Sequence, residues 1–150
     1  MADNKTILVI EDNNDVRENI AEILTLSSYN VLEAQNGKIG VEMAIKNKPD
    51  LIICDIMMPE LDGFGVLRII NRNPETMDIP FLFLTAKTEK EDFRKGMILG
   101  ADDYITKPFD DVELLDAIEM RIKKSERIKQ IPINNKENII SSFINLARGE

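Results

Sequence analysis

The sequence contains no histidine, and this absence excludes several kinds of chemistry. Histidine-based general acid–base catalysis, histidine-ligated zinc and a phosphohistidine are all ruled out within these 150 residues. The one cysteine, Cys54, cannot form an internal disulfide, and its apolar neighbours indicate a buried thiol in a reducing compartment. No apolar run is long enough to span a membrane, and no signal peptide is visible at the N-terminus. We therefore expect a cytoplasmic protein with no membrane partner.

The chain also has fewer basic residues than acidic ones. The 27 acidic residues outnumber the 19 lysines and arginines, which gives a net charge of −8. Because phosphate contacts dominate the affinity of proteins for nucleic acids, this balance argues against direct nucleic-acid binding by the chain. With 43% hydrophobic and 31% charged residues, the chain has the composition and the length of one globular domain with a buried core.

Short apolar runs alternate with longer amphipathic segments over most of the chain. The apolar runs predict strands at residues 6–10, 29–34, 51–55, 81–85 and 103–106. The amphipathic segments predict helices at residues 14–27, 37–47, 64–73, 88–99 and from 110 onward. This alternation is typical of an α/β fold, a doubly wound five-stranded parallel sheet with helices on both faces. The continuous apolar character of the first, third and fourth strands indicates that they are central.

Polar side chains stand where the predicted strands end. Glu11 and Asp12 follow the first strand, Asp55 ends the third, Thr85 ends the fourth, and Lys107 follows the fifth. The carboxyl ends of parallel strands lie at one edge of the sheet, which is where open α/β folds bind ligands. We therefore expect these residues to share one pocket.

The acidic residues of this pocket suit Mg²⁺, which prefers hard oxygen ligands and keeps several of its waters. We expect Asp12 and Asp55 to bind the ion directly and Glu11 to act through a bound water. The backbone carbonyl of Met57, just beyond Asp55 in a turn, is a further candidate ligand. A carboxylate beside a metal is also able to act as a nucleophile toward phosphorus.

Phosphoryl transfer depends mainly on alignment and on neutralising the charge of the equatorial phosphoryl oxygens. In the expected pocket Mg²⁺ would take one oxygen and the Lys107 ammonium a second. The Thr85 hydroxyl and the Ala86 N–H would take the third. Each role is matched by a residue at a predicted strand end, so the pattern predicts a metal-assisted phosphoryl-transfer site.

Over about residues 5–127, these motifs together resemble the receiver domain of two-component response regulators. The resemblance rests on four groups of residues in the order and spacing of the family: Glu11-Asp12, the run from Asp55 through Met58-Pro59 to Gly63, Thr85-Ala86 and Lys107-Pro108-Phe109. The acidic pair is Glu-Asp where many members have Asp-Asp, which leaves Asp12 as the direct metal ligand.

The resemblance implies a CheY-like domain with the flavodoxin-like strand order 2-1-3-4-5. It also implies that Asp55 accepts a phosphoryl group from the phosphohistidine of a sensor histidine kinase or of a phosphotransfer protein. Glu11 and Asp12 would hold the Mg²⁺. Lys107 would contact the phosphoryl group, next to a cis peptide bond before Pro108.

The resemblance further implies a switch. Thr85 would be the switch hydroxyl, and Tyr104 the aromatic residue that turns inward with it. The surface of the fourth helix, fifth strand and fifth helix would then change and control a downstream output, with transcription the expected one. In this interpretation the protein is not an enzyme, except that it catalyses its own phosphorylation and dephosphorylation.

Residues 1–129 are expected to form the receiver, and residues 130–150 a linker and a C-terminal amphipathic helix. Three roles for that helix stay open: packing on its own domain, pairing with a second copy, or leading to an output domain outside this chain. A phosphorylation-dependent homodimer, formed through the surface of the fourth and fifth helices, is a separate possible partner interaction. Two alternative functions also stay open, a stand-alone receiver acting through protein–protein contacts and a phosphorylation-independent binding module. A haloacid-dehalogenase-like phosphatase is disfavoured, because that family has a second Asp where this chain has Met57.

Overall fold

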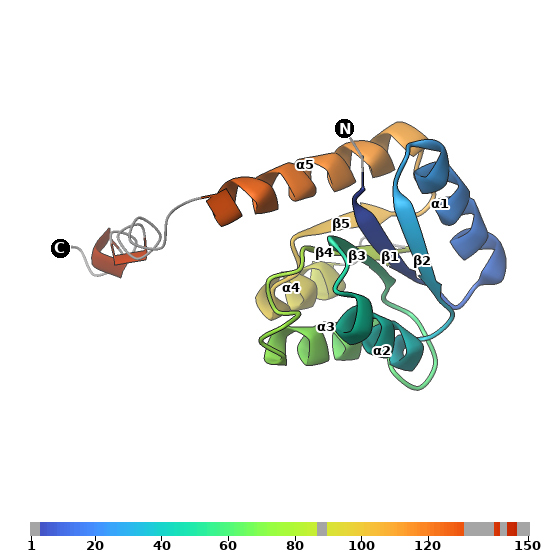
Figure 1. Ribbon diagram of the computed structural model, residues 1–150. Coiled ribbons are helices and arrows are strands. Elements are labelled where there is room, and N and C mark those ends of the chain that lie inside the picture. The colour runs from blue at the N-terminus through green and yellow to red at the C-terminus, as the bar shows by residue number, and fades with distance from the viewer. Residues whose placement is uncertain (1–3, 87–89, 131–139, 142–143, 147–150) are drawn as a thin grey trace.

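The computed structural model describes residues 4–86, 90–130, 140–141 and 144–146. Strands and helices alternate along the chain up to residue 130 (Figure 1). The strands are β1 (Thr6–Ile10), β2 (Asn30–Ala34), β3 (Leu51–Asp55), β4 (Phe81–Thr85) and β5 (Asp103–Thr106). The helices are α1 (Asn14–Leu26), α2 (Gly37–Asn47), α3 (Gly63–Arg72), α4 (Lys90–Leu99) and α5 (Asp111–Gln130). The ten strands and helices predicted before residue 130 are all present, and their described ends differ from the predicted ones by no more than two residues. The predicted start of the fourth helix, at residue 88, lies outside the described residues.

The five strands pair in parallel, in the order β2-β1-β3-β4-β5. The predicted fold class and strand order are therefore confirmed. The chain runs from β1 outward to β2 and then crosses to β3 on the other side, so the strand order reverses between β1 and β3. At this reversal Ile10 lies opposite Cys54, which makes the carboxyl ends of the two strands neighbours. In such sheets the reversal is the position of the ligand site.

The core lies on both faces of the sheet, because successive residues of a strand point to opposite sides. On one face, α2 and α3 cover strand residues such as Leu8, Ile52 and Phe83. On the other face, α1 and α5 cover residues such as Ile7 and Leu82. Every residue of β3 and β4 is buried, as predicted for central strands. Full burial of each such aliphatic or aromatic side chain contributes about 1.5–3 kcal/mol.

Caps and a close backbone approach fix the loops at the carboxyl edge of the sheet. Asn13 caps α1 and Asp62 caps α3, each through a side-chain oxygen that accepts a backbone N–H of the first turn. Gly63 begins α3 directly against the end of β3, where a Cβ would lie 2.8 Å from the Cα of Ile56 and closer still to the carbonyl oxygen of Asp55. A glycine is therefore required for α3 to start this close to the strand.

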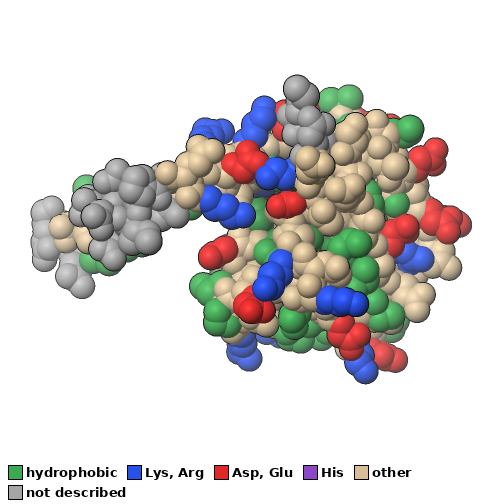
Figure 2. All heavy atoms as spheres, in the orientation of Figure 1, with side chains coloured by type: hydrophobic (Ala, Val, Ile, Leu, Met, Phe, Trp, Pro, Cys, Tyr) green, Lys and Arg blue, Asp and Glu red, His purple; other side chains and the backbone are tan. Residues whose placement is uncertain are grey.

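Helix α5 extends over 20 residues and projects beyond the sheet (Figure 1). Leu114, Ile118 and Ile122 are buried at its base, whereas residues 127–130 are exposed. On the face of the molecule seen in Figure 2, acidic and basic side chains are interspersed. Most of the predicted C-terminal segment, residues 130–150, lies outside the described residues, so the boundary at residue 129 stays a prediction. Among the described helices, none combines the length and apolarity needed to cross a membrane.

Candidate functional site

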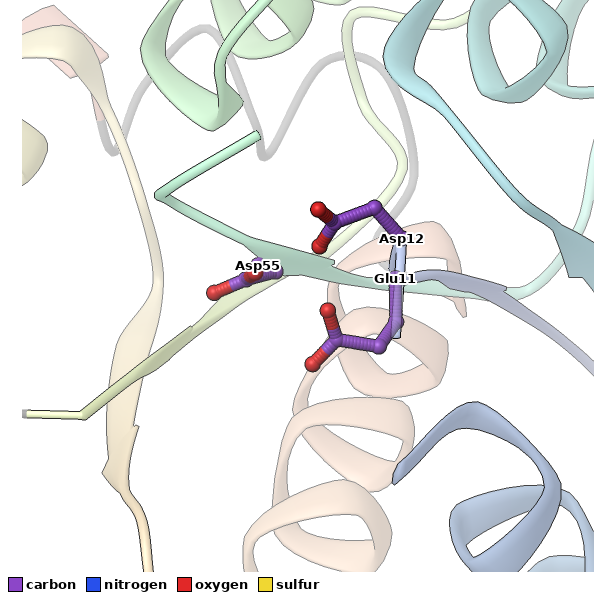
Figure 3. A group of neighbouring side chains, drawn as sticks. All are labelled: Glu11, Asp12 and Asp55. Atoms are coloured by element: carbon purple, nitrogen blue, oxygen red, sulfur yellow. The ribbon is translucent and has the colours of Figure 1, made fainter. Parts of the chain in front are cut away.

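Three carboxylates meet at the carboxyl ends of β1 and β3 (Figure 3). Glu11 and Asp12 follow β1 and Asp55 ends β3, and an oxygen of each lies within 4.8 Å of the other two. Glu11 is fully buried and Asp55 is 6% exposed, whereas Asp12 opens to solvent. The structure thus brings together the acidic residues that the sequence places at neighbouring strand ends.

Lys107 supplies the cation of this cluster. Its ammonium Nζ lies 2.5 Å from Oε1 of Glu11 and 3.4 Å from Oδ1 of Asp55. It follows β5, and its backbone N–H donates to the carbonyl of Thr85 at 2.7 Å, so the ends of β4 and β5 are tied together beside the acids. The Lys107–Pro108 peptide bond is cis, as expected.

The charges of the cluster perturb its titrating groups. Burial of Lys107 works against its charge, but the hydrogen bond to Glu11 and the negative charge of Asp55 outweigh that effect and raise the pKa of Lys107. Partial removal from water, followed by the hydrogen bond and charge of Glu11, raises the pKa of Asp12. Lys107 therefore stays protonated at neutral pH, and Asp12 holds its proton more tightly than an isolated aspartate.

The excess of negative charge fits a divalent cation. Three carboxylates share one ammonium, so the ionised cluster is two positive charges short. Mg²⁺ prefers a few oxygen ligands from the protein and retains several waters. The three carboxylates match this preference, because that of Asp12 is exposed to water. The donor set contains no sulfur or imidazole, which softer metals prefer.

The remaining predicted site residues stand around this cluster. Thr85 ends β4, is 5% exposed and lies in register with Thr106 of β5. Ala86 follows it and is exposed. The side chain of Met57 is 75% exposed, so it does not occupy the cluster, and only its backbone carbonyl is a candidate ligand. The roles assigned to these residues stay predictions.

Tyr104 lies on the α4 side of β5. Its ring is packed between Phe83 of β4, at 5.5 Å between centroids, and Phe93 of α4, at 5.0 Å. Its hydroxyl end is directed at Gly96 of α4, where an added Cβ would lie 2.8 Å from the Tyr104 Cζ. The expected switch residue thus occupies the contact between β4, β5 and α4.

Arg17 belongs to the site but was not predicted from the sequence. It lies in the second turn of α1, and its NH1 group donates to the backbone carbonyl of Glu11 at 2.7 Å. Its only signal in the sequence is its position, five residues after Asp12 on a helix that begins beside the acidic pair. That spacing places Arg17 near the loop, but it does not reveal that the side chain reaches back to the carbonyl.

Comparison with known proteins gives consistent results. Residues 7–119 match the response regulator receiver domain. The chain is 39% identical over 124 residues to the DNA-binding dual master transcriptional regulator RpaA of Synechocystis, covering 83% of this chain and 52% of that protein. It is 40% identical over 121 residues to the phosphate regulon transcriptional regulatory protein PhoB of Pseudomonas aeruginosa, covering 81% and 53%. The chain therefore spans about half the length of these curated relatives.

Solved structures share the fold. The chemotaxis protein CheY4 of Vibrio cholerae superposes with a TM-score of 0.75 at 27% identity, over 78% of this chain and 98% of CheY4. The receiver domain of the sensor histidine kinase PA1611 from Pseudomonas aeruginosa, which has magnesium coordinated in its active-site cleft, gives a TM-score of 0.75 at 29% identity, over 80% and 98%. With its strand order, its acidic cluster and its match over residues 7–119, this chain belongs to the response regulator receiver domain family of two-component systems.

Proposed function

We propose that Asp55 accepts a phosphoryl group from the phosphohistidine of a sensor histidine kinase or of a phosphotransfer protein. The observation that carries this proposal is the meeting of Asp55, Glu11 and Asp12 within 4.8 Å at the strand-order reversal, with the Lys107 ammonium 3.4 Å from the Asp55 carboxylate. Since these 150 residues contain no histidine, the donor imidazole has to come from another molecule.

The proposed reaction is a single displacement at phosphorus, in which each residue of the site has one role. A carboxylate oxygen of Asp55 forms the new O–P bond while the P–N bond to the donor imidazole breaks, and the imidazole leaves with the electron pair of that bond. Asp12 and Asp55, with the carbonyl of Met57 and with Glu11 through water, would hold a Mg²⁺ that neutralises charge on one phosphoryl oxygen. Lys107 would neutralise a second oxygen.

Thr85 and Ala86 complete the proposed contacts to the third oxygen, through a hydroxyl and a backbone N–H. Phosphorylation adds close to two negative charges at Asp55. Lys107, which Glu11 and Asp55 hold in the described structure, then has a more strongly charged partner. The coupled movement of Thr85 and Tyr104 shifts the population between two arrangements of the α4-β5-α5 surface.

The relatives support an output at the level of transcription, because RpaA and PhoB are named as transcriptional regulators. We propose that the chain controls such an output in the cytoplasm through contacts of the α4-β5-α5 surface, including a phosphorylation-dependent homodimer. The net charge of −8 argues against direct DNA contact by these residues. The protein would not act on other substrates, and its catalysis would be limited to its own phosphorylation and dephosphorylation.

The test is phosphorylation by acetyl phosphate with Mg²⁺, read by intact mass. Wild type is expected to gain one phosphoryl group, and Asp55→Asn none. Asp78→Asn is the matched control, because Asp78 is exposed and precedes β4 at the opposite edge of the sheet. Uptake by Asp55→Asn would contradict the assignment of Asp55. No uptake by wild type or by the control would leave two interpretations, a receiver that accepts phosphate only from its own protein donor and a binding module that works without phosphorylation.

A further inference from the structure

The guanidinium of Arg17 joins three parts of the molecule. NH1 donates to the backbone carbonyl of Glu11 at 2.7 Å, and NH2 donates to Oδ1 of Asn14 at 2.6 Å. Nε lies 3.4 Å from a carboxylate oxygen of Glu33 on β2. The Arg17 side chain is only 12% exposed, whereas Asn14 and Glu33 are open to solvent. The hydrogen bond to the Glu11 carbonyl is partly buried and charge-assisted.

The carbonyl that Arg17 holds belongs to the peptide that joins Glu11 to Asp12. In a regular strand, neighbouring side chains point to opposite faces. Here the two neighbouring carboxylates turn toward one space, shared with Asp55 (Figure 3). The backbone therefore has to leave strand geometry at this peptide, and its plane decides where both carboxylates point.

Other contacts fix the first side of this peptide. The backbone N–H of Glu11 donates to the carbonyl of Ala34 on β2 at 3.1 Å, and Lys107 holds the Glu11 carboxylate. Asp12, on the second side, is exposed to solvent. The backbone N–H of Asn13, one residue further on, also donates to Oε2 of Glu11, at 3.4 Å. Among the described contacts, the hydrogen bond from Arg17 is the one made to the carbonyl of this peptide itself, and at 2.7 Å it resists rotation of the peptide.

We infer that Arg17 is a positioning residue for the metal site, which sets the peptide between Glu11 and Asp12 so that both carboxylates face Asp55. This inference rests on the proposed function, because the proposed ligand of the carboxylates is Mg²⁺. That ion demands near-ideal octahedral geometry with short bonds, so a small rotation of the ligand-bearing peptide weakens binding strongly. Residues that orient metal ligands typically change metal affinity by about 10–100-fold when they are replaced.

A positioning role and a purely electrostatic role of Arg17 predict opposite changes in Mg²⁺ affinity when Arg17 is replaced. Arg17 is a cation near a cation site, so removing its charge alone would strengthen the binding of Mg²⁺. If Arg17 holds the ligands in place, removing it weakens the binding instead. The direction of the change in Mg²⁺ affinity therefore separates the two roles without any measurement of phosphorylation.

The experiment measures Mg²⁺ affinity by isothermal titration calorimetry on the full chain, for wild type and three variants. Urea unfolding first establishes that each variant is folded under the titration conditions. Arg17→Gln is expected to bind Mg²⁺ about tenfold more weakly. Arg17→Lys, which keeps the charge and one donor group, should recover part of this loss. Glu33→Gln removes the ion pair to β2 but leaves the donor to the Glu11 carbonyl, and should stay within about twofold of wild type.

The outcomes distinguish the inference from the proposed function. Equal or tighter Mg²⁺ binding by Arg17→Gln would overturn the positioning role. Weakening by Glu33→Gln as large as that by Arg17→Gln would overturn it too, because the ion pair alone would then account for the effect. Absence of saturable Mg²⁺ binding by wild type would instead contradict the metal site of the proposed function.

Discussion

Gly96 is an unfavourable residue for the interior of α4, and its place beside Tyr104 explains why it stands there. Glycine within a helix costs about 0.5–1 kcal/mol relative to alanine. A Cβ at this position would lie 2.8 Å from the Cζ of Tyr104, 3.0 Å from its Cε2 and closer still to its hydroxyl oxygen. Gly96→Ala therefore gains helix propensity but forces the ring of Tyr104 to move.

The size of the effect follows from what the ring loses. Tyr104 contacts Phe83 and Phe93 at 5.5 and 5.0 Å. Such aromatic pairs contribute about 0.5–1.5 kcal/mol each beyond simple burial. Against the gain in propensity, we expect Gly96→Ala to destabilise the wild-type protein by roughly 0.5–2 kcal/mol. Without the ring, in a Tyr104→Ala background, the same change should stabilise it by about 0.5–1 kcal/mol.

Urea unfolding of the four proteins of this double-mutant cycle, followed by far-ultraviolet circular dichroism, measures both effects. The decisive result is the reversal of sign between the two backgrounds. Equal stabilisation by Gly96→Ala with and without the Tyr104 ring would refute the steric argument. A second readout is available because the chain has no tryptophan and two tyrosines. In a Tyr29→Phe background, Gly96→Ala should shift the fluorescence of Tyr104.

Two further predictions concern charged groups. Lys107→Met should cost about 3 kcal/mol in urea unfolding without Mg²⁺, because buried Glu11 and Asp55 lose their shared cation. Addition of Mg²⁺ should restore part of this loss, and unchanged stability of the variant would contradict the argument. Burial raises the pKa of Asp102, so folding favours its protonated form and stability is lost as the pH rises from the unfolded pKa through the raised folded value. Asp102→Asn keeps an acceptor oxygen but carries no charge, so in urea unfolding it should be more stable than wild type at neutral pH. The difference in stability should vanish in acid. A variant less stable than wild type at neutral pH would disprove this reasoning.

Much of the fold and of the acidic cluster could be predicted because backbone periodicity determines them. The continuous apolar runs of β1, β3 and β4 identified buried parallel strands, and the rule for strand ends then placed Glu11, Asp12 and Asp55 together. The same rule for strand ends also predicted the position of Lys107, because this residue follows β5. These positions depend on where elements end, which the sequence marks clearly.

The orientation of side chains could not be predicted in the same way. Arg17 and Tyr104 contact residues far from them in the sequence or on other elements, and their contacts depend on rotamers set by tertiary packing. The importance of Gly96 is likewise invisible until the Tyr104 ring is placed beside it. The exposed side chain of Met57 also follows from the path of the loop after β3 and not from its apolar character.

The C-terminal part of α5 extends beyond the sheet as a rigid helical lever (Figure 1). Exposed Gln130 follows buried Leu114 by sixteen positions along the helix, or about 24 Å at the usual rise. A tilt of about 5° at the base, where Ile118 and Ile122 pack on the sheet, would move the tip by roughly 2 Å. The helix thereby converts a small tilt at its base into a larger displacement of its tip. A distance probe attached at the tip can record that displacement.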